Sequence, residues 1–297
     1  MISVIIPCYN SEDCLPRAVQ SVLSQSYHDT ELILVNNNST DGTWQLLEGY
    51  EMKYPDKVFI CNELKPGAPA ARNAGLNIAR GEWIQFLDAD DELLPDKLLQ
   101  QFTIALKKQA DVVIGGSLLR YNTNGNIKEI WRHTDNNVWR GLISSNLGIT
   151  SSNLWRRNTL LKVSGWDESQ TSSQEYHLLF RLLKNGAKIA ADKAFNTIIY
   201  FSGDSVSKST DSKKLAGIFN RRIDLRTSIK QYLIACNRLT PMLSQAIDNY
   251  IYAEAMRMYP FIPDDVTDVI MRHAPKVNWL SKFKQKSRSL LKRLSRL

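Results

Sequence analysis

Short apolar runs alternate with amphipathic stretches from residue 3 to residue 87. The apolar runs are rich in β-branched and aromatic residues, which predicts four strands, at residues 3–6, 31–35, 58–61 and 83–87. The intervening stretches have apolar residues at helical spacing, which predicts helices at residues 13–25, 43–54 and 70–79. Strands that alternate with helices are typical of a three-layer α/β/α fold around a mostly parallel, Rossmann-like sheet.

Helices and strands alternate less regularly after residue 87. We expect further strands at residues 111–115, 188–191 and 197–201, the last two completing the sheet, and an extended segment at 152–156. A turn-forming run rich in asparagine predicts a hairpin between residues 118–121 and 127–131. Helices are expected at residues 93–106, 139–147, 157–163 and 174–184.

The polar segment 202–214, which contains five serines, marks the expected domain boundary. We therefore expect one domain at residues 1–210 and a helical C-terminal extension at residues 211–297. Within this extension, apolar periodicity predicts helices at residues 215–237, 241–259, 263–273 and 277–297.

Charge and composition narrow the class of protein. The formal net charge is +8, yet eight of the 38 basic residues lie in residues 274–297, and the remaining 30 match the 30 acidic residues. A body without excess positive charge argues against nucleic acid as a partner. No apolar run reaches the ~18 residues of a transmembrane helix, and four cysteines without metal spacing indicate reduced thiols. We expect a cytoplasmic enzyme.

Three carboxylates follow the strand predicted at residues 83–87. Asp88, Asp90 and Asp91 repel one another unless a cation lies between them. Mg²⁺ and Mn²⁺ prefer carboxylate oxygen and take phosphate oxygens and water as further ligands. The pattern thus predicts a divalent cation that holds a diphosphate; the alternative is an acidic first turn of the helix at residues 93–106.

Other polar segments end at the same edge. In parallel α/β sheets ligands bind outside the carboxyl ends of the strands. Residues 7–10, 36–41 and 88–91 each follow a predicted strand, so we expect them to form one site.

Several short segments occur in a fixed order, namely residues 3–10, 35–43, 71–75, 87–91, 165–167, 174–175 and 203–207. In order and spacing they resemble the family 2 glycosyltransferases with a GT-A fold, over about the first 210 residues. The resemblance implies an inverting transfer of a sugar from a nucleotide-diphospho-sugar, with a UDP-sugar favoured, to an acceptor hydroxyl. It also implies assistance by Mn²⁺ or Mg²⁺.

The resemblance assigns the donor-binding residues. Tyr9 would stack on the base, between Pro7 and Asn10, unless it is a packing residue of the core. Asn37 stands where the family often has an aspartate that accepts the base N–H, and its amide oxygen can accept this bond more weakly. Asp41 is expected to cap a turn.

The resemblance also places the diphosphate and metal. Arg72 would pair with phosphate oxygens, which suits a planar guanidinium, unless it is a surface arginine. Asp90 would bind the metal directly. Asp88, next to Ala89, would reach the metal, its waters or the ribose.

Inversion requires a base that takes the proton of the attacking hydroxyl. Glu175 matches the second member of the family's acidic pair, although the first member is replaced here by Gln174. We assign Glu175 as the base, with Asp167 as the second candidate and a helix-start acid as the alternative role. Trp155 and Trp166 are expected either to face sugar rings or to lie in the core.

The basic tail intersperses cations with apolar residues, which approximates an amphipathic helix. One hypothesis is that it docks on the anionic inner face of the plasma membrane, near a saccharide or lipid-linked acceptor of envelope or extracellular polysaccharide synthesis. The alternative is a helix that packs on the body or on another subunit.

Two other functions compete with the glycosyltransferase. A catalytically silent sugar-nucleotide-binding protein would tolerate the change at Gln174. A sugar-phosphate nucleotidyltransferase would need a glycine-rich phosphate loop after the first strand, and residues 7–10 contain no glycine.

Overall fold

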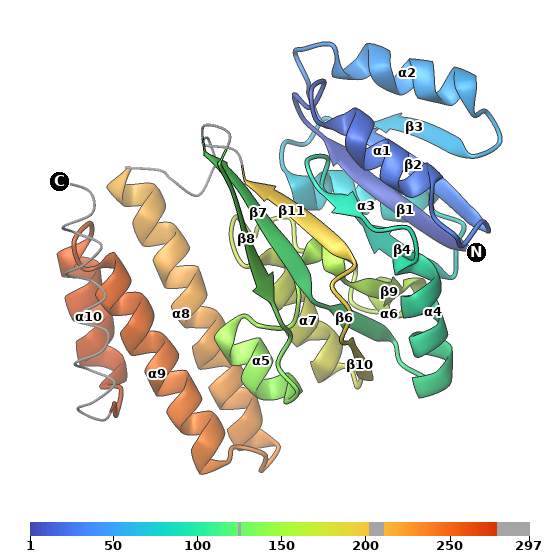
Figure 1. The fold of residues 1–297 in the computed structure, drawn as a ribbon. Helices are drawn as coiled ribbons and strands as arrows, with labels where there is room; N and C mark the ends of the chain where they lie inside the picture. Colours follow the sequence, from blue (N-terminus) through green and yellow to red (C-terminus); the bar gives the residue numbers. More distant parts are fainter. Residues whose placement is uncertain (124–125, 202–210, 278–297) are drawn as a thin grey trace. The chain divides into compact units, whose positions relative to one another are not determined.

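The computed structural model describes residues 1–123, 126–201 and 211–277 of the chain. These residues form two compact units (Figure 1). The first unit consists of residues 1–138, 146–170 and the described residues from 174 to 201. The second consists of residues 139–145, 171–173 and the described residues from 211 onward. The units are therefore not consecutive along the sequence.

A seven-stranded sheet forms the centre of the first unit, in the order β10-β6-β9-β4-β1-β2-β3. Its strands are β1 Ile2–Cys8, β2 Thr30–Asn36, β3 Val58–Asn62, β4 Trp83–Phe86, β6 Val112–Gly115, β9 Leu154–Arg156 and β10 Ile189–Asp192. In this sheet β9 runs antiparallel to β4 and β6, while the other neighbours pair in parallel. The predicted α/β class with a mostly parallel sheet is confirmed.

Helices cover this sheet because its strands are apolar on both faces. The helices of the first unit are α1 Leu15–Leu23, α2 Thr43–Lys53, α3 Ala68–Ile78, α4 Lys97–Lys108, α6 Arg157–Leu161 and α7 Gln174–Lys184. On one face of β1, Val4 and Ile6 pack with Val19 of α1 in a buried cluster. On the other face, Ile5 lies directly against Gly75 of α3. The alternation of side chains along β1 thus serves both helix layers.

A smaller second sheet has the order β5-β11-β7-β8. Its strands are β5 Glu92–Leu93, β7 Ser117–Thr123, β8 Asn126–Arg132 and β11 Thr197–Phe201. The predicted hairpin is confirmed as β7 and β8, which pair antiparallel. The expectation that residues 197–201 complete the main sheet is wrong, because β11 pairs with β5 and β7. An apolar run predicts a strand but does not select its partner.

The helix expected at residues 93–106 begins later, at Lys97. Pro95 disfavours helical backbone at the residue before it, and Glu92–Leu93 instead form β5 against β11. The alternative interpretation of the acidic cluster as a first helical turn is therefore wrong, because Asp96 occupies the N-cap position.

The second unit is helical, with α5 Val138–Ser144, of which residues 139–144 belong here, and α8 Ser212–Ala235, α9 Pro241–Met258 and α10 Pro263–His273. Buried Arg226 of α8 donates a hydrogen bond to the Ile143 carbonyl at 2.9 Å and lies 3.6 Å from the ring centre of Tyr250. One side chain thus joins α5, α8 and α9. The helix predicted from residue 277, with the basic tail, lies outside the described residues beyond Val277.

Within the part of the chain that the structure describes, no helix combines the length and apolarity needed to cross a membrane.

Candidate active site

The carboxyl ends of β1, β2 and β4 lie next to one another. Cys8 pairs with Asn36 and Ile5 pairs with Phe86, all in parallel register. The segments that follow these strands therefore meet at one edge of the sheet. Ligands of open α/β sheets bind at this edge.

The loop after β1 presents an exposed tyrosine. Pro7, the residue before the last of β1, is partly buried, and Tyr9, the first residue after β1, is 64% exposed. The alternative of a tyrosine packed in the core is wrong. Asn10, in left-handed backbone at φ 46°, accepts a hydrogen bond from the Thr40 amide at 2.7 Å. Asn10 thus joins the loops after β1 and β2.

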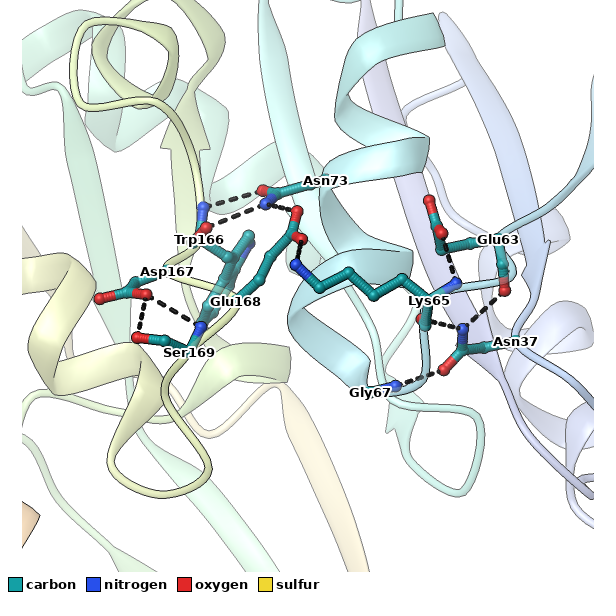
Figure 2. Close-up of polar contacts among 9 residues, drawn as sticks. All are labelled: Asn37, Glu63, Lys65, Gly67, Asn73, Trp166, Asp167, Glu168 and Ser169. Atoms are coloured by element: carbon teal, nitrogen blue, oxygen red, sulfur yellow. Dashed lines mark hydrogen bonds and ion pairs between the residues drawn. The ribbon is translucent and has the colours of Figure 1, made fainter.

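Asn37 is buried and organises residues 63–67 (Figure 2). Its Nδ2 donates to the carbonyls of Glu63 and Lys65, each at 2.8 Å. Its Oδ1 accepts from the Gly67 amide at 2.8 Å. Both donors of this amide are engaged within the protein, and a carboxylate could not make the two donated bonds.

Arg72 of α3 links three parts of the site. Its Nη2 donates to Asp88 at 2.6 Å, and its Nη1 donates to Gln174 at 3.0 Å. The guanidinium carbon lies 4.7 Å from the ring centre of Trp166. The Arg72 side chain is only 6% exposed, so the alternative of a surface arginine is wrong. These contacts bring the start of α7 to residues 88–92 after β4, which we call the acidic loop.

The two tryptophans of the sequence prediction are core residues. Trp155 is fully buried, and Trp166 is buried with its ring edge against Phe86. Of the two roles left open for them, facing sugar rings is therefore wrong.

Asn73, next to Arg72, holds the loop that follows Gly165 (Figure 2). Its Oδ1 accepts from the Trp166 amide at 2.8 Å, and its Nδ2 donates to the Trp166 carbonyl at 2.9 Å and to Glu168 at 2.8 Å. Glu168 in turn forms an ion pair with Lys65 at 2.7 Å. Sequence reasoning missed this clamp, although Asn73 lies within the segment 71–75 that it had singled out.

The acidic loop is organised by Ser151, in the 3₁₀ turn η1 Thr150–Ser152. The Ser151 hydroxyl accepts from the Asp88 amide at 3.1 Å and donates to the Asp91 carboxylate at 2.5 Å. The Asp91 amide also donates to the Asp88 carbonyl at 3.0 Å. Asp90 is exposed at the level of the whole residue, and Ala89 is buried. Nothing in the local sequence around Ser151 indicated this role.

Negative charge is concentrated in this loop, although Arg72 pairs with Asp88. Loss of surrounding water and the neighbouring charge of Asp88 raise the pKa of Asp90. Burial and then the charges of Asp88 and Asp90 hold the pKa of Asp91 well above its usual range. A bound cation would stabilise the ionised form of these groups.

The donor set fits a divalent cation that arrives with its substrate. Among the described residues, no group of three or more histidine, cysteine or acidic side chains forms a cage for a metal. Asp90, which is exposed, and Asp88, whose side chain is 38% exposed, provide hard carboxylate oxygen donors. Mg²⁺ is commonly held by one or two carboxylates, with phosphate oxygens and water as its other ligands.

Glu175 lies in the first turn of α7 and is partly buried. Burial raises the pKa of its carboxyl, the charges of Arg72 and Arg132 lower it, and that of Asp88 raises it. The residue before it, Gln174, accepts a hydrogen bond from Arg72 at 3.0 Å, so Glu175 lies near the Arg72–Asp88 pair. Asp167 differs: burial raises its pKa, but hydrogen bonds from Ser169 outweigh this and leave the pKa below its usual value. Asp167 is therefore the weaker base.

Comparison with known proteins adds to this geometry. The family model described as glycosyl transferase family 2 matches residues 3–168. The poly(ribitol-phosphate) beta-glucosyltransferase of Bacillus spizizenii is 30% identical over 213 residues, which cover 71% of this chain and 31% of that protein. The chain spans about a third of the length of the first curated relatives that it matches.

Solved structures share the fold at low sequence identity. TarS of S. aureus, residues 1–349, in complex with UDP-GlcNAc, aligns with a TM-score of 0.65 and 18% identity over 97% of this chain and 79% of that one. The mannosyltransferase PcManGT of Pyrobaculum calidifontis, in complex with GDP-Man and Mn²⁺, aligns with a TM-score of 0.57 and 15% identity, covering 98% and 79%. These likenesses show the fold.

Proposed function

The chain belongs to glycosyl transferase family 2, and we propose that it transfers a sugar, with inversion, from a nucleotide-diphospho-sugar to an acceptor hydroxyl. The observation that carries this proposal is that Arg72 donates hydrogen bonds both to Asp88, at 2.6 Å, and to Gln174, at 3.0 Å. Glu175 is the next residue of α7 after Gln174, and this neighbourhood supports its assignment as the base near the acidic loop. A base and a diphosphate site are the two parts that an inverting transfer requires.

In this proposal Glu175 is the general base. Its carboxylate takes the proton of the acceptor hydroxyl as the acceptor oxygen bonds to the anomeric carbon. The bond from that carbon to the diphosphate breaks, and the nucleoside diphosphate leaves with the bonding electrons. A base works best when its pKa lies near the working pH, and burial moves the pKa of Glu175 upward in this direction.

The donor end of the site is assigned to the first three loops. The exposed ring of Tyr9 is available to stack on a base, beside Pro7 and Asn10. Asn37 shapes the loop 63–67 on the same side. We favour a UDP-sugar, in line with the UDP-GlcNAc complex of TarS, whereas the GDP-Man complex of PcManGT leaves guanine as the alternative.

Asp90 and Asp88 are the residues that would hold Mn²⁺ or Mg²⁺, and the structure of PcManGT is a complex with GDP-Man and Mn²⁺. A divalent ion here supplies positive charge to the departing diphosphate. In this proposal Arg72 adds a guanidinium to the same phosphate oxygens. Ala89, between the two aspartates, is assigned to the donor side of this loop.

We assign the acceptor to envelope or extracellular polysaccharide synthesis, as a saccharide or lipid-linked saccharide. The name of the Bacillus relative, which specifies poly(ribitol-phosphate), supports a cell-wall polymer. We further propose a cytoplasmic location with the basic tail docked on anionic lipid. Deletion of residues 276–297 should abolish co-sedimentation with anionic liposomes, and unchanged sedimentation would remove the membrane hypothesis.

A donor screen tests the central proposal. Purified protein with Mn²⁺ should release nucleoside diphosphate from one sugar nucleotide of a panel, and more so with an acceptor. Glu175→Gln should retain donor binding and reduce transfer by about 100-fold or more, whereas the control Asp167→Asn should retain transfer. Donor binding without turnover in the wild type would instead support the catalytically silent binding protein.

A further inference from the structure

Arg17 of α1 contacts the acidic loop through its main chain. Its Nη2 donates a hydrogen bond to the Asp90 carbonyl oxygen at 2.6 Å. Within the described residues, no ion pair of 4.0 Å or less joins Arg17 to the Asp90 carboxylate. The guanidinium thus holds the backbone of Asp90, a residue that is exposed, without pairing with its carboxylate.

The guanidinium is itself held in place by Tyr200 of β11. Its central carbon lies 3.7 Å from the Tyr200 ring centre, which is a close stacking contact. The Tyr200 hydroxyl donates to Glu92 at 2.5 Å and accepts from Arg120 at 3.1 Å. Because both the ring and the hydroxyl of Tyr200 are engaged, the stacking surface under Arg17 is fixed.

These contacts secure the acidic loop from outside the main sheet. Arg17 holds the loop at Asp90, and Tyr200 holds it two residues later at Glu92. Ser151 holds the opposite side, at Asp88 and Asp91. Asp90 is therefore an exposed residue whose main chain is anchored.

We propose that Arg17 is a positioning residue that fixes the Asp90 main chain so that its carboxylate faces the cation accompanying the donor diphosphate. This inference rests on the proposed function. It differs from two other roles open to an arginine here. As a phosphate ligand, Arg17 would bind nucleotide directly, and as a competing cation it would weaken metal binding.

Titration calorimetry with UDP, with and without Mn²⁺, distinguishes these roles in the full chain. Groups that orient metal ligands typically contribute about 10- to 100-fold in metal affinity. We expect Arg17→Gln and Arg17→Lys both to reduce the Mn²⁺-dependent gain in UDP affinity by about tenfold, with Mn²⁺-free UDP binding unchanged. Lysine keeps the charge but loses the planar stacking contact. Tyr200→Phe, which loses only the hydroxyl, should show a smaller loss.

The matched control is Arg156→Gln. Like Arg17, Arg156 lies against an aromatic ring, with its guanidinium carbon 5.9 Å from the ring centre of Trp83. Its ion pairs are with Glu82 at 3.0 Å and Asp111 at 4.0 Å, and neither partner belongs to the acidic loop. Its Mn²⁺-dependent gain should equal that of the wild type. Equal melting temperatures of the Arg17 and Arg156 variants would show that the former fold normally.

Several outcomes overturn the inference. Tighter Mn²⁺ binding in Arg17→Gln would identify a competing cation, and weaker Mn²⁺-free UDP binding would identify a phosphate ligand. A full Mn²⁺-dependent gain in Arg17→Lys would show that charge alone matters. A wild-type protein without any Mn²⁺-dependent gain would contradict the proposed function itself, and the inference with it.

Discussion

Asn37 shows how one amide sets the shape of a loop beside the site. Its two N–H groups donate to carbonyls of residues 63 and 65, and its oxygen accepts from Gly67. The family resemblance leads one to expect an aspartate here. An ionised aspartate would place negative oxygen against two carbonyl oxygens, so the amide is required by the loop that this chain uses.

Asn37→Asp should therefore destabilise the protein in a pH-dependent way. We expect a loss of about 2 kcal/mol at pH 8. Only a protonated carboxyl can donate to these carbonyls, so the folded state should raise the pKa of the new side chain. The loss should then be smaller at pH 5 and grow as the pH rises through that raised pKa. Urea unfolding at both pH values measures the difference.

Asn62→Asp is the matched control. The Asn62 Oδ1 accepts from Asn36 at 2.8 Å on the exposed side of the sheet, and a carboxylate oxygen can accept this bond equally well. It should change stability by less than about 0.5 kcal/mol at either pH. Equal losses in both variants would contradict the role given to the Asn37 donors.

The pH dependence of transfer should report Glu175. Because burial raises its pKa, the acidic limb of kcat/KM should lie above the range of an ordinary glutamate. The charge of Arg132 lowers this pKa, so Arg132→Gln should move the limb to higher pH. Arg132→Lys, which keeps the charge, should leave the limb near its wild-type position. If the acidic limb of kcat/KM stays at the same pH in Arg132→Gln, Glu175 is not the group whose titration produces it.

At the scale of elements, α3 packs unusually close to the sheet. A Cβ on Gly75 would lie 2.4 Å from Ile5 Cγ2 and 3.2 Å from Val35 Cγ2. Gly75 lies one turn after Arg72, so the same close approach brings the guanidinium to Asp88. The glycine of this segment is therefore a packing requirement.

Gly75→Ala should destabilise the protein, since overpacking costs about 1–3 kcal/mol and outweighs the gain of about 1 kcal/mol from helix propensity. Gly49→Ala is the matched control in α2, where nothing lies within 4 Å of the added Cβ. It should stabilise by about 0.5–1 kcal/mol. Urea unfolding measures both, and stabilisation by Gly75→Ala would contradict the packing argument.

Strand β4 carries a buried glutamine whose reason lies in another element. Gln85 accepts a hydrogen bond from Lys97 of α4 and donates to the Ser151 carbonyl at 2.9 Å. Lys97 is fully buried, and burial holds its pKa well below its usual range. This pair connects the strand to α4 and to the turn that organises the acidic loop.

Lys97→Met should lower the free energy of unfolding by about 2 kcal/mol, because it leaves the Gln85 oxygen buried without its donor. Lys107→Met, on the exposed side of the same helix, should change it by less than about 0.5 kcal/mol. Unfolding in guanidinium chloride measures the free energies of both variants. An unchanged free energy of unfolding in Lys97→Met would contradict this prediction. It would show that the cost of burying the amine cancels the gain from its hydrogen bond.

At the scale of the whole molecule, the chain enters the second unit before the first is complete. Residues 139–145 belong with α8 and α9, and Trp139 packs against Tyr232 with ring centres 5.6 Å apart. Arg226 adds the hydrogen bond to Ile143. A helix from the middle of the sequence is therefore part of the C-terminal unit.

Truncation after residue 210 should consequently lower stability. It removes the partners of α5 and exposes the apolar face of that helix, including buried Leu142 and Ile143. We expect a lower melting temperature and increased binding of a hydrophobic dye. A truncated chain with the melting temperature of the full one would show that the helical extension is dispensable for folding.

The features of the fold that depend on local sequence patterns could be predicted, and those that depend on distant contacts could not. The four strands of residues 2–86 and the helices between them follow from periodicity, and each was predicted to within a few residues. Asp88, Asp90 and Arg72 could be selected because motifs in a fixed order carried them. Ser151, Asn73 and Arg17 could not, because the hydrogen-bond partners of their side chains lie 60 to 95 residues away and no local pattern records such contacts.

The sequence by itself determined the mostly parallel sheet, the edge at which its loops meet and the family to which the chain belongs. Alternation of apolar and polar residues decides local structure, and parallel strands place their carboxyl ends on one side. Only the tertiary structure decided the pairing of β11, the burial of Trp166 and the anchoring of the acidic loop. These depend on which distant groups meet in space, where a buried polar atom must find its partner.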